Sequence, residues 1–199
     1  TRGAEGLMSA LEMSRPPGEP AWVDEVLRFW FTELAYEQCF KKDDVVDRQI
    51  DERFGAIHAR LAADAGSIDT AAPRELLAAI VVFDQFSRNL FRGTPRAFAS
   101  DPLARQLART ALDSGIDKEL SKRERIFVYL PFEHSEDAAD QVRSVTLLGS
   151  LGDAELDKYA IAHKVIIDRF GRFPHRNVAL GRESTPEEIA FLKEPMSSF

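Results

Sequence analysis

The sequence predicts an all-α protein, an antiparallel bundle or array of about seven to nine helices. Two observations carry this prediction. Apolar residues recur at helical spacing along most of the chain, and no run of about four to eight β-branched residues alternates strictly with polar ones. Several of the expected helices also begin or end with residues that favour helix caps. With 199 residues, the chain is long enough for one substantial hydrophobic core.

The first twenty residues do not follow this helical pattern. We expect residues 1–20 to be loose and disordered, because Pro16 and Pro17 lie in a proline- and glycine-rich stretch that forbids a continuous helix. The chain begins at Thr1, so we expect the part before Met8 or Met13 to include a non-native remnant. From residue 21 to residue 199 we expect a single helical domain.

Two helices are expected between residues 21 and 64. The first covers residues 21–34 and the second about residues 44–64, each with apolar side chains along one face. Aromatic residues at this spacing usually pack in a core, so we interpret both tryptophans as core residues. The two faces consist of Trp22, Val26, Phe29, Trp30 and Leu34 in the first helix and Val46, Ile50, Phe54, Ile57 and Leu61 in the second.

The most informative stretch is residues 76–93, LLAAIVVFDQFSRNLFRG. Residues 76–83 are apolar throughout, which predicts a helix buried on every side. Asp84, Arg88 and Arg92 then follow at i, i+4 and i+8, which places them in one row on the same helix. A buried helix that ends in a row of charges needs partners for those charges.

Capping residues mark the next helices. Asp101 and Pro102 are expected to be the N-cap and the first position of a helix that runs to Gly115. Residues 121–124, SKRE, match a capping box that opens another helix, and Pro131 is expected to end or kink it.

Three further cap signals lie in the C-terminal third. Ser135 is a candidate cap for a helix with Val142 and Val145 on its apolar side. A longer helix is expected at residues 153–170, followed by a glycine that suits its C-terminal cap. Residues 185–188, TPEE, combine a capping box with proline at the first helical position and predict a last short helix.

Composition limits the possible functions. The formal net charge is -7 and the isoelectric point is near 5.2, which argues against general nucleic-acid binding. The single cysteine, Cys39, excludes an intramolecular disulfide and a cysteine-rich zinc site. No apolar run approaches the roughly 20 residues of a membrane span, and no signal-peptide pattern is visible. We therefore expect a cytoplasmic protein with no membrane partner and no cofactor.

Three segments concentrate polar groups that a plain helical protein does not need. The third is basic: residues 163–182 carry a net charge of +4 with the histidines neutral, mostly from arginines, which favour bidentate contacts with carboxylates and phosphates. The second holds four acids within residues 133–140. The segments consist of Asp84, Gln85, Arg88, Asn89 and Arg92; of Glu133, His134, Glu136, Asp137 and Gln141; and of His163, Arg169, Arg172, His175, Arg176, Asn177 and Arg182.

Three hypotheses account for these segments. In the first, arginines converge on a small anionic ligand or a peptide; no glycine-rich phosphate loop is present, so side chains would hold the anion. In the second, a histidine beside a carboxylate, with or without a metal ion, makes the protein an enzyme. In the third, acids and arginines pair with each other and only anchor an irregular segment.

We place the first hypothesis foremost and treat enzymatic activity as the less favoured reading. No histidine pair has metal-ligand spacing, and a lone helical histidine such as His163 is more often a satisfied core residue. We therefore predict no metal ligands and no identified catalytic residue. The predicted ligand-binding residues are Asp84, Arg88, Asn89, Arg92, Glu133, His134, Arg172, His175, Arg176 and Asn177.

The same segments carry a resemblance to a known family. The stretches DQFSRNLFRGTPRAFASD, LPFEHSEDAADQ and HKVIIDRFGRFPHRNVALGRESTPEE resemble the bacterial domain-of-unknown-function family 924, as do VLRFWF and FKKDDVVD nearer the N-terminus. The resemblance covers about residues 22–193, with FGRFPHRN its most specific part. It implies an all-helical domain of the tetratricopeptide-like superfamily and no established activity. By analogy of fold, such a domain favours binding over catalysis and a peptide or protein partner as well as a small anion.

Two positions depart from the family pattern. Ser87 stands where the family usually has proline, which implies a relaxed kink in the central helix. Cys39 stands where a tryptophan usually precedes Phe40, which implies the loss of an aromatic wall in the N-terminal half.

Overall fold

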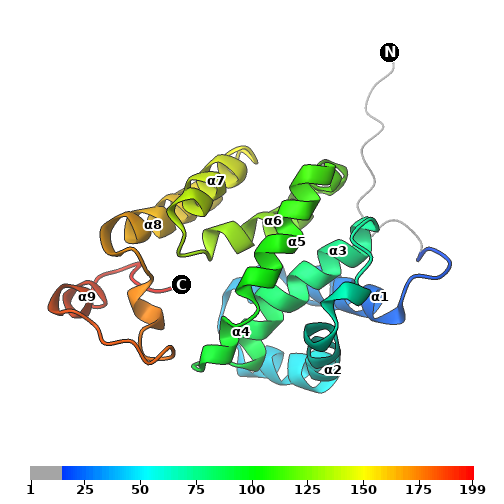
Figure 1. Cartoon of the computed structure of the whole chain (residues 1–199), viewed down its shortest axis with the longest axis horizontal. Coiled ribbons are helices and arrows are strands. Elements are labelled where there is room, and N and C mark those ends of the chain that lie inside the picture. The colour runs from blue at the N-terminus through cyan, green and yellow to red at the C-terminus, as the bar shows by residue number, and fades with distance from the viewer. Residues whose placement is uncertain (1–14) are drawn as a thin grey trace, which may run out of the picture. The chain divides into compact units, whose positions relative to one another are not determined.

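The computed structural model describes residues 15–199, and every regular element in this range is helical (Figure 1). This confirms the predicted all-α class. The expected disordered segment at residues 1–20 lies mostly outside the described residues, because the description starts at residue 15.

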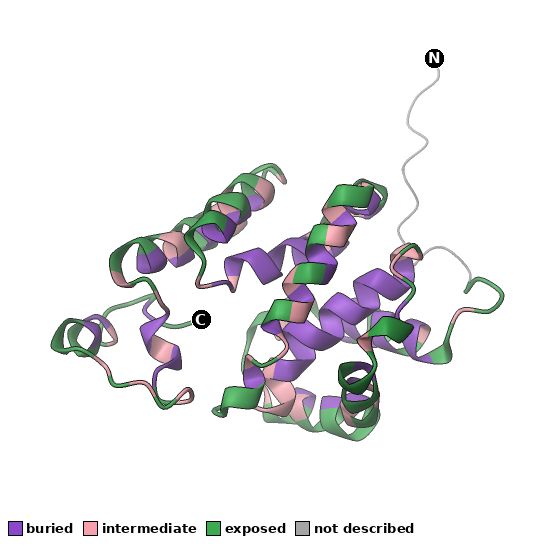
Figure 2. Cartoon of the chain, in the orientation of Figure 1, coloured by how far each residue is buried: buried purple, intermediate pink, exposed green. Residues whose placement is uncertain are grey.

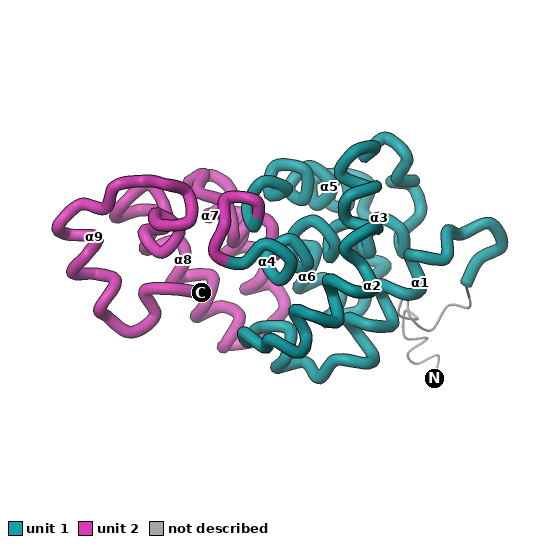
Figure 3. The backbone as a smooth tube through the Cα atoms, turned by 90° about the horizontal axis from the view of Figure 1, so that it is seen from below, with its two compact units in different colours: residues 1–92, 97–128 teal, residues 93–96, 129–199 magenta. Residues whose placement is uncertain are grey.

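The chain forms two compact units (Figure 3). Unit 1 contains the described residues up to Arg92 together with Ala97–Val128, and unit 2 contains Gly93–Arg96 and Tyr129–Phe199. The single domain expected from residue 21 onward stays a prediction.

Unit 1 contains the helices that the N-terminal half of the sequence predicted. Helix α2 follows the prediction closely: the carboxylate of its N-cap, Asp43, accepts hydrogen bonds from the backbone N–H groups of Val45 and Val46. The helices are α1 (Ala21–Arg28), α2 (Asp44–Ala63), α3 (Pro73–Ile80), α4 (Ser87–Leu90) and α5 (Asp101–Ser114), and α6 (Lys122–Glu133) begins in the same unit.

The central stretch is helical but not a uniform α-helix. A π-helical turn, Val81–Phe86, joins α3 to α4, and a second π-helical turn, Phe29–Glu33, follows α1. Residues 76–83 are buried throughout, as their apolar sequence predicted, and they include the C-terminal part of α3 (Figure 2). The expected charged row holds only in part, because α4 ends at Leu90 and Arg92 lies beyond it.

An aromatic cluster forms the core of unit 1. The rings of Phe29 and Phe54 lie 5.1 Å apart, and the Trp30 ring contacts Phe86 at 5.5 Å and Phe127 at 5.6 Å. The edge-on geometry of the two tryptophan contacts is favourable for aromatic pairs. Trp30 is thus the core residue that helical spacing predicted.

Three predicted cap or break positions differ from the structure. Asp101 is the first residue of α5 rather than its N-cap, and its carboxylate pairs with Arg88 instead. Pro131 does not end α6, which continues to Glu133. Asp137, not Ser135, caps the next helix, because its carboxylate accepts from two backbone N–H groups while the Ser135 hydroxyl bonds a side chain.

Unit 2 contains α7 (Ala138–Gly149), α8 (Ala154–Phe170) and α9 (Pro186–Phe191). Helices α7 and α8 pack side by side after a short connection, as expected for antiparallel neighbours (Figure 1). The predicted glycine cap of α8 is confirmed by the left-handed φ of +68° at Gly171. The capping box of α9 is also present, and α9 packs through Phe191 on a small core with Ile166, Ile167 and Phe173.

Candidate functional site

The first predicted segment lies in unit 1, where it forms ion pairs. The Arg88 guanidinium donates to both carboxylate oxygens of Asp101, at 2.9 and 3.1 Å, and lies 3.5 Å from the carboxylate of Asp84. Asp84 is fully buried and accepts a hydrogen bond of 2.6 Å from the Gln85 amide. Arg88 therefore serves as a counter-charge for two buried acids.

Asn89 and Arg92 share one carboxylate in unit 1. The Asn89 amide donates to Asp47 at 2.7 Å, and Arg92 donates to both oxygens of the same carboxylate at 2.8 and 2.9 Å. These contacts tie the end of the central stretch to the start of α2. The predicted roles of these side chains in ligand binding stay predictions.

Residues 87 and 58 form a buried polar pair that the sequence analysis did not identify. The Ser87 hydroxyl lies 2.8 Å from Nε2 of His58, and both residues are buried. The family resemblance implies a proline at this position, and proline has no hydroxyl to offer His58. The departure at Ser87 therefore supplies a hydrogen-bond partner inside unit 1.

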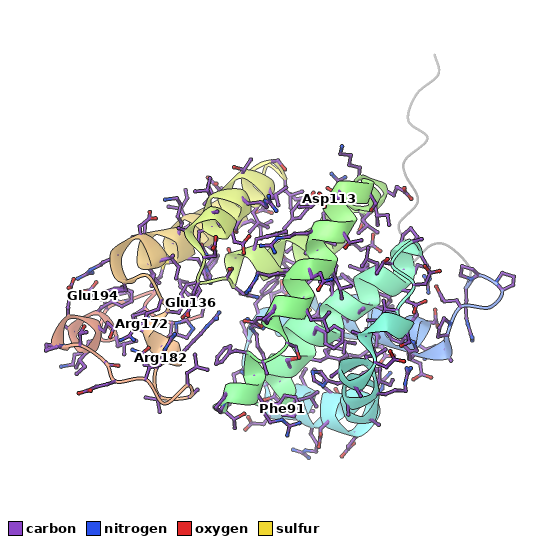
Figure 4. The ribbon with its side chains drawn as sticks, in the orientation of Figure 1. Phe91, Asp113, Glu136, Arg172, Arg182 and Glu194 are labelled. Carbon is purple, nitrogen blue, oxygen red and sulfur yellow. The ribbon has the colours of Figure 1, made fainter. Side chains whose placement is uncertain are left out.

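The second and third predicted segments come together in unit 2. The Glu136 carboxylate accepts two hydrogen bonds from Arg182, at 2.8 and 2.9 Å, and one from the backbone N–H of Phe173 at 2.8 Å (Figure 4). Burial is the largest single influence on Glu136 and would raise its pKa, but the hydrogen bonds from Arg182 and Phe173 and the charges of Arg182 and Arg176 together lower the net pKa. Arg182 and Glu136 thus fix the start of the irregular segment after α8.

Arg172 and Asn177 hold α9 through Glu188. Arg172 donates to both oxygens of the buried Glu188 carboxylate, at 2.7 and 2.8 Å, and the Asn177 amide donates to one of them at 3.3 Å. These hydrogen bonds, with Arg172 contributing most, lower the pKa of Glu188 to about 2. Glu188 also completes the capping box of α9, so Arg172 has a clear structural role.

The remaining predicted residues surround a histidine that the sequence analysis interpreted as a core residue. We use the term histidine cluster for His134, His163 and His175 of unit 2. The His163 ring lies 6.3 Å from the His134 ring and 5.6 Å, edge-on, from the Phe173 ring, which in turn lies 5.6 Å from the His175 ring. His163 is the most buried of the three, with 4% of its surface exposed.

His163 is neutral near pH 7. Burial is the main cause that lowers its pKa to about 3, and the positive charges of His134, Arg176 and His175 lower it further. Its Nδ1 lies 2.8 Å from the Tyr159 carbonyl oxygen. An N–H at Nδ1 that donates to this carbonyl leaves Nε2 as the acceptor nitrogen.

Arg176 and Glu133 complete the surroundings of the cluster. The Arg176 guanidinium lies 4.5 Å from the centre of the Phe173 ring and donates to the His134 carbonyl oxygen at 2.9 Å. The Glu133 carboxylate lies 3.6 Å from Nδ1 of His163. The Gln141 amide donates to the Glu133 carbonyl oxygen at 2.7 Å, which holds the end of α6 in place. Four predicted residues therefore gather around His163.

Helical spacing gave a partial signal for His163, since Tyr159 precedes it by one turn on the same face of α8. The residues outside α8 that contact His163 could not be predicted from helical spacing, because they come from three separate parts of the chain. A pocket in which all three predicted segments meet stays a prediction.

Cys39 offers little nucleophilic chemistry. Partial burial raises the pKa of its thiol from 9.0 to about 11, although the charge of Arg123 opposes this shift. We expect iodoacetamide at pH 8 to alkylate Cys39 roughly 100-fold more slowly in the folded than in the urea-unfolded protein, because two pKa units reduce the thiolate fraction by about that factor. Mass spectrometry of timed aliquots measures both rates. Equal rates would contradict the raised pKa.

The described residues contain neither a metal-binding group of side chains nor a membrane-spanning helix. Between residues 15 and 199, no group of three or more His, Cys, Asp or Glu side chains is placed to hold a metal ion. No helix within this range is both long and apolar enough to cross a membrane.

The fold and the cluster define an all-helical protein with a buried site rich in histidine and arginine. The profile of the family described as "Bacterial protein of unknown function (DUF924)" matches residues 26–196. The chain belongs to this family, and the resemblance read from its motifs is confirmed. No curated protein matches the chain.

A solved structure agrees with this assignment. A protein of unknown function from Agrobacterium tumefaciens is 39% identical in sequence and superposes with a TM-score of 0.81. The match covers 87% of this chain and 97% of that protein. Both the family and this solved protein are described as being of unknown function, so the function is uncharacterised.

Proposed function

We propose that the protein binds a small anionic ligand at the histidine cluster of unit 2. One observation carries the proposal. The imidazoles of His134 and His175 and the guanidinium of Arg176 gather around the buried His163 and the adjoining ring of Phe173. Imidazole N–H groups supply hydrogen-bond donors for a carboxylate or phosphate, and the guanidinium supplies donors and a positive charge. Buried titratable groups with strongly shifted pKa values gather more often at functional sites than elsewhere.

The electrostatics favour an anion over a cation at this place. The permanent charge of Arg176 lowers the pKa of His163, and His134 and His175 lower it further when they are protonated. A negative ligand group beside them is stabilised by the same charges. Glu133, the carboxylate nearest to His163, opposes this effect at 3.6 Å, so the ligand's charge is expected on the Arg176 side.

The two alternative hypotheses are less well supported at this cluster. An enzyme would need a general base with a pKa near the working pH, and a pKa of about 3 makes His163 a poor base near neutrality. The scaffold hypothesis accounts directly for Arg172 and Arg182, each of which pairs with a carboxylate in unit 2. A peptide as the ligand, a tetratricopeptide-like architecture and a cytoplasmic location stay predictions.

A thermal-shift screen against carboxylates and phosphate monoesters tests the proposal. A ligand at about 100 times its dissociation constant should stabilise the protein by roughly 2.7 kcal/mol, which moves the melting temperature measurably. Matched sodium chloride and sulfate samples are needed, since sulfate stabilises many proteins without a site.

Two variants make the screen specific. Arg176→Gln should abolish the shift, because it removes the positive charge beside the cluster. Arg169→Gln is the matched control: Arg169 lies in the same unit but is 43% exposed and paired with Glu187. A shift that survives in Arg176→Gln, or is lost equally in both variants, would place the ligand elsewhere. A screen with no selective shift would favour the scaffold hypothesis.

A further inference from the structure

The ring of Phe199 occupies a defined position on the histidine cluster. It stacks on the His163 ring with a centroid distance of 3.9 Å and an interplanar angle of 25°. Tyr159 and His175 meet the same ring nearly edge-on, at 6.1 and 6.4 Å. Three side chains from two parts of unit 2 therefore form a seat for one aromatic ring, and stacked and edge-on contacts are the favourable geometries for such a seat.

The segment that carries Phe199 is held by a hydrogen bond of Ser197, two residues before the ring. The Ser197 hydroxyl is buried and donates to the Leu192 carbonyl oxygen at 3.2 Å, just past α9. Met196 has a left-handed φ of 58°, a conformation that a residue with a side chain adopts at a cost. Phe199 itself is 44% exposed. Its ring contacts the seat while nearly half of the residue stays open to solvent.

The seat adjoins the groups expected to hold the anion. Phe173 connects the two, because its ring contacts the His163 and His175 rings of the seat and also the Arg176 guanidinium. A positive charge therefore lies one aromatic ring away from the seat.

We propose that the ligand of the histidine cluster is an anion that carries an aromatic ring, and that the Phe199 ring occupies its place and competes with it. This inference rests on the proposed function, because it names the class of anion that the same site binds. The segment from Leu192 to Phe199 then acts as a strap that a suitable ligand displaces.

Titrations with two matched pairs of probes test the inference. Phenyl phosphate is compared with methyl phosphate, and phenylacetate with acetate, so that each pair carries the same type of charged group with and without an aromatic substituent. Isothermal titration of the wild-type chain and of Phe199→Ala measures the affinity for all four. We expect Phe199→Ala to bind at least one aromatic probe roughly threefold to tenfold more tightly than wild type, the range that one aromatic contact provides. Affinity for the non-aromatic partner should not change.

The control variant is Phe40→Ala, which removes an exposed phenylalanine of unit 1 and should leave every affinity unchanged. Equal affinity of wild type and Phe199→Ala for the aromatic probes would overturn the inference. If the probes bind wild type and Arg176→Gln weakens that binding, the proposed function stands and only the inference fails. If no probe binds to any variant, the proposed function and the inference both fail.

Discussion

Acidification should destabilise the protein between pH 6.5 and pH 4.5, and His163→Gln should remove most of this dependence. His163 has a pKa of about 3 in the folded protein against 6.5 for an unperturbed histidine. Between these two values the unfolded chain binds one proton more than the folded chain, so the free energy of unfolding falls as the pH falls. The expected slope is about 1.4 kcal/mol per pH unit, or roughly 2 to 3 kcal/mol over the window.

The pH window separates His163 from Glu188. The pKa of Glu188 is lowered from 4.5 to about 2, so its contribution to stability is present above pH 4.5 and is lost only as the pH falls below that value. Burial raises the pKa of Glu75 above 4.5, so the contribution of His163 is read from the difference between wild type and His163→Gln in urea titrations at pH 4.5, 5.5 and 6.5. Glutamine at position 163 keeps a polar side chain but cannot become charged.

An NMR titration gives an independent readout. The ring resonances of His163 should show no protonation step above about pH 5 in the folded protein. A step near pH 6.5, or equal pH slopes for wild type and His163→Gln, would show that the folded environment does not keep this ring neutral. The buried site would then lack the electrostatics on which the proposed function depends.

Local signals in the sequence predicted the helices well. The capping residues Asp43 and Asp153 accept hydrogen bonds at the starts of α2 and α8, and Thr185 and Glu188 form the capping box of α9. Each of these signals depends on residues within one helical turn, and such local preferences persist in the folded chain. The apolar run in α3 predicted burial correctly, because nothing polar interrupts it.

The errors concern residues whose distant partners decide their role. Asp101 reads as an N-cap, but the Arg88 guanidinium, thirteen positions away, takes its carboxylate. The π-helical turn at Val81–Phe86 has no signal in the apolar run, which predicts a helix without distinguishing a π-helical turn from an α-helix. Phe199 contacts His163 across 36 positions, a pairing that no spacing rule indicates.

Candidate site residues were found by residue type, not by geometry. Arginine-rich segments marked Arg172 and Arg176 alike, yet one pairs with a buried carboxylate of α9 and the other lies on an aromatic ring beside the histidines. The two environments differ because residues 171–177 turn sharply after α8, so neighbouring arginines reach different partners.

Arg88→Ala should destabilise the protein by about 3 kcal/mol or more, whereas Arg92→Ala should cost less than about 1 kcal/mol. The Arg88 side chain is 20% exposed and pairs with the side chains of Asp84 and Asp101, which are 1% and 8% exposed. Removal of the guanidinium takes their shared counter-charge away from two carboxylates that water reaches poorly. Arg92 is 37% exposed, and its single partner Asp47 is 18% exposed.

Urea unfolding at pH 7 measures both variants against wild type. Arg88→Lys separates charge from geometry: it keeps the positive charge but loses the bidentate contact with Asp101, so its stability should lie between that of wild type and that of Arg88→Ala. Equal stability of Arg88→Ala and wild type would contradict the ion-pair role. That result would favour the predicted role of Arg88 in ligand binding, because a buried arginine that does not stabilise the fold needs another reason to be there.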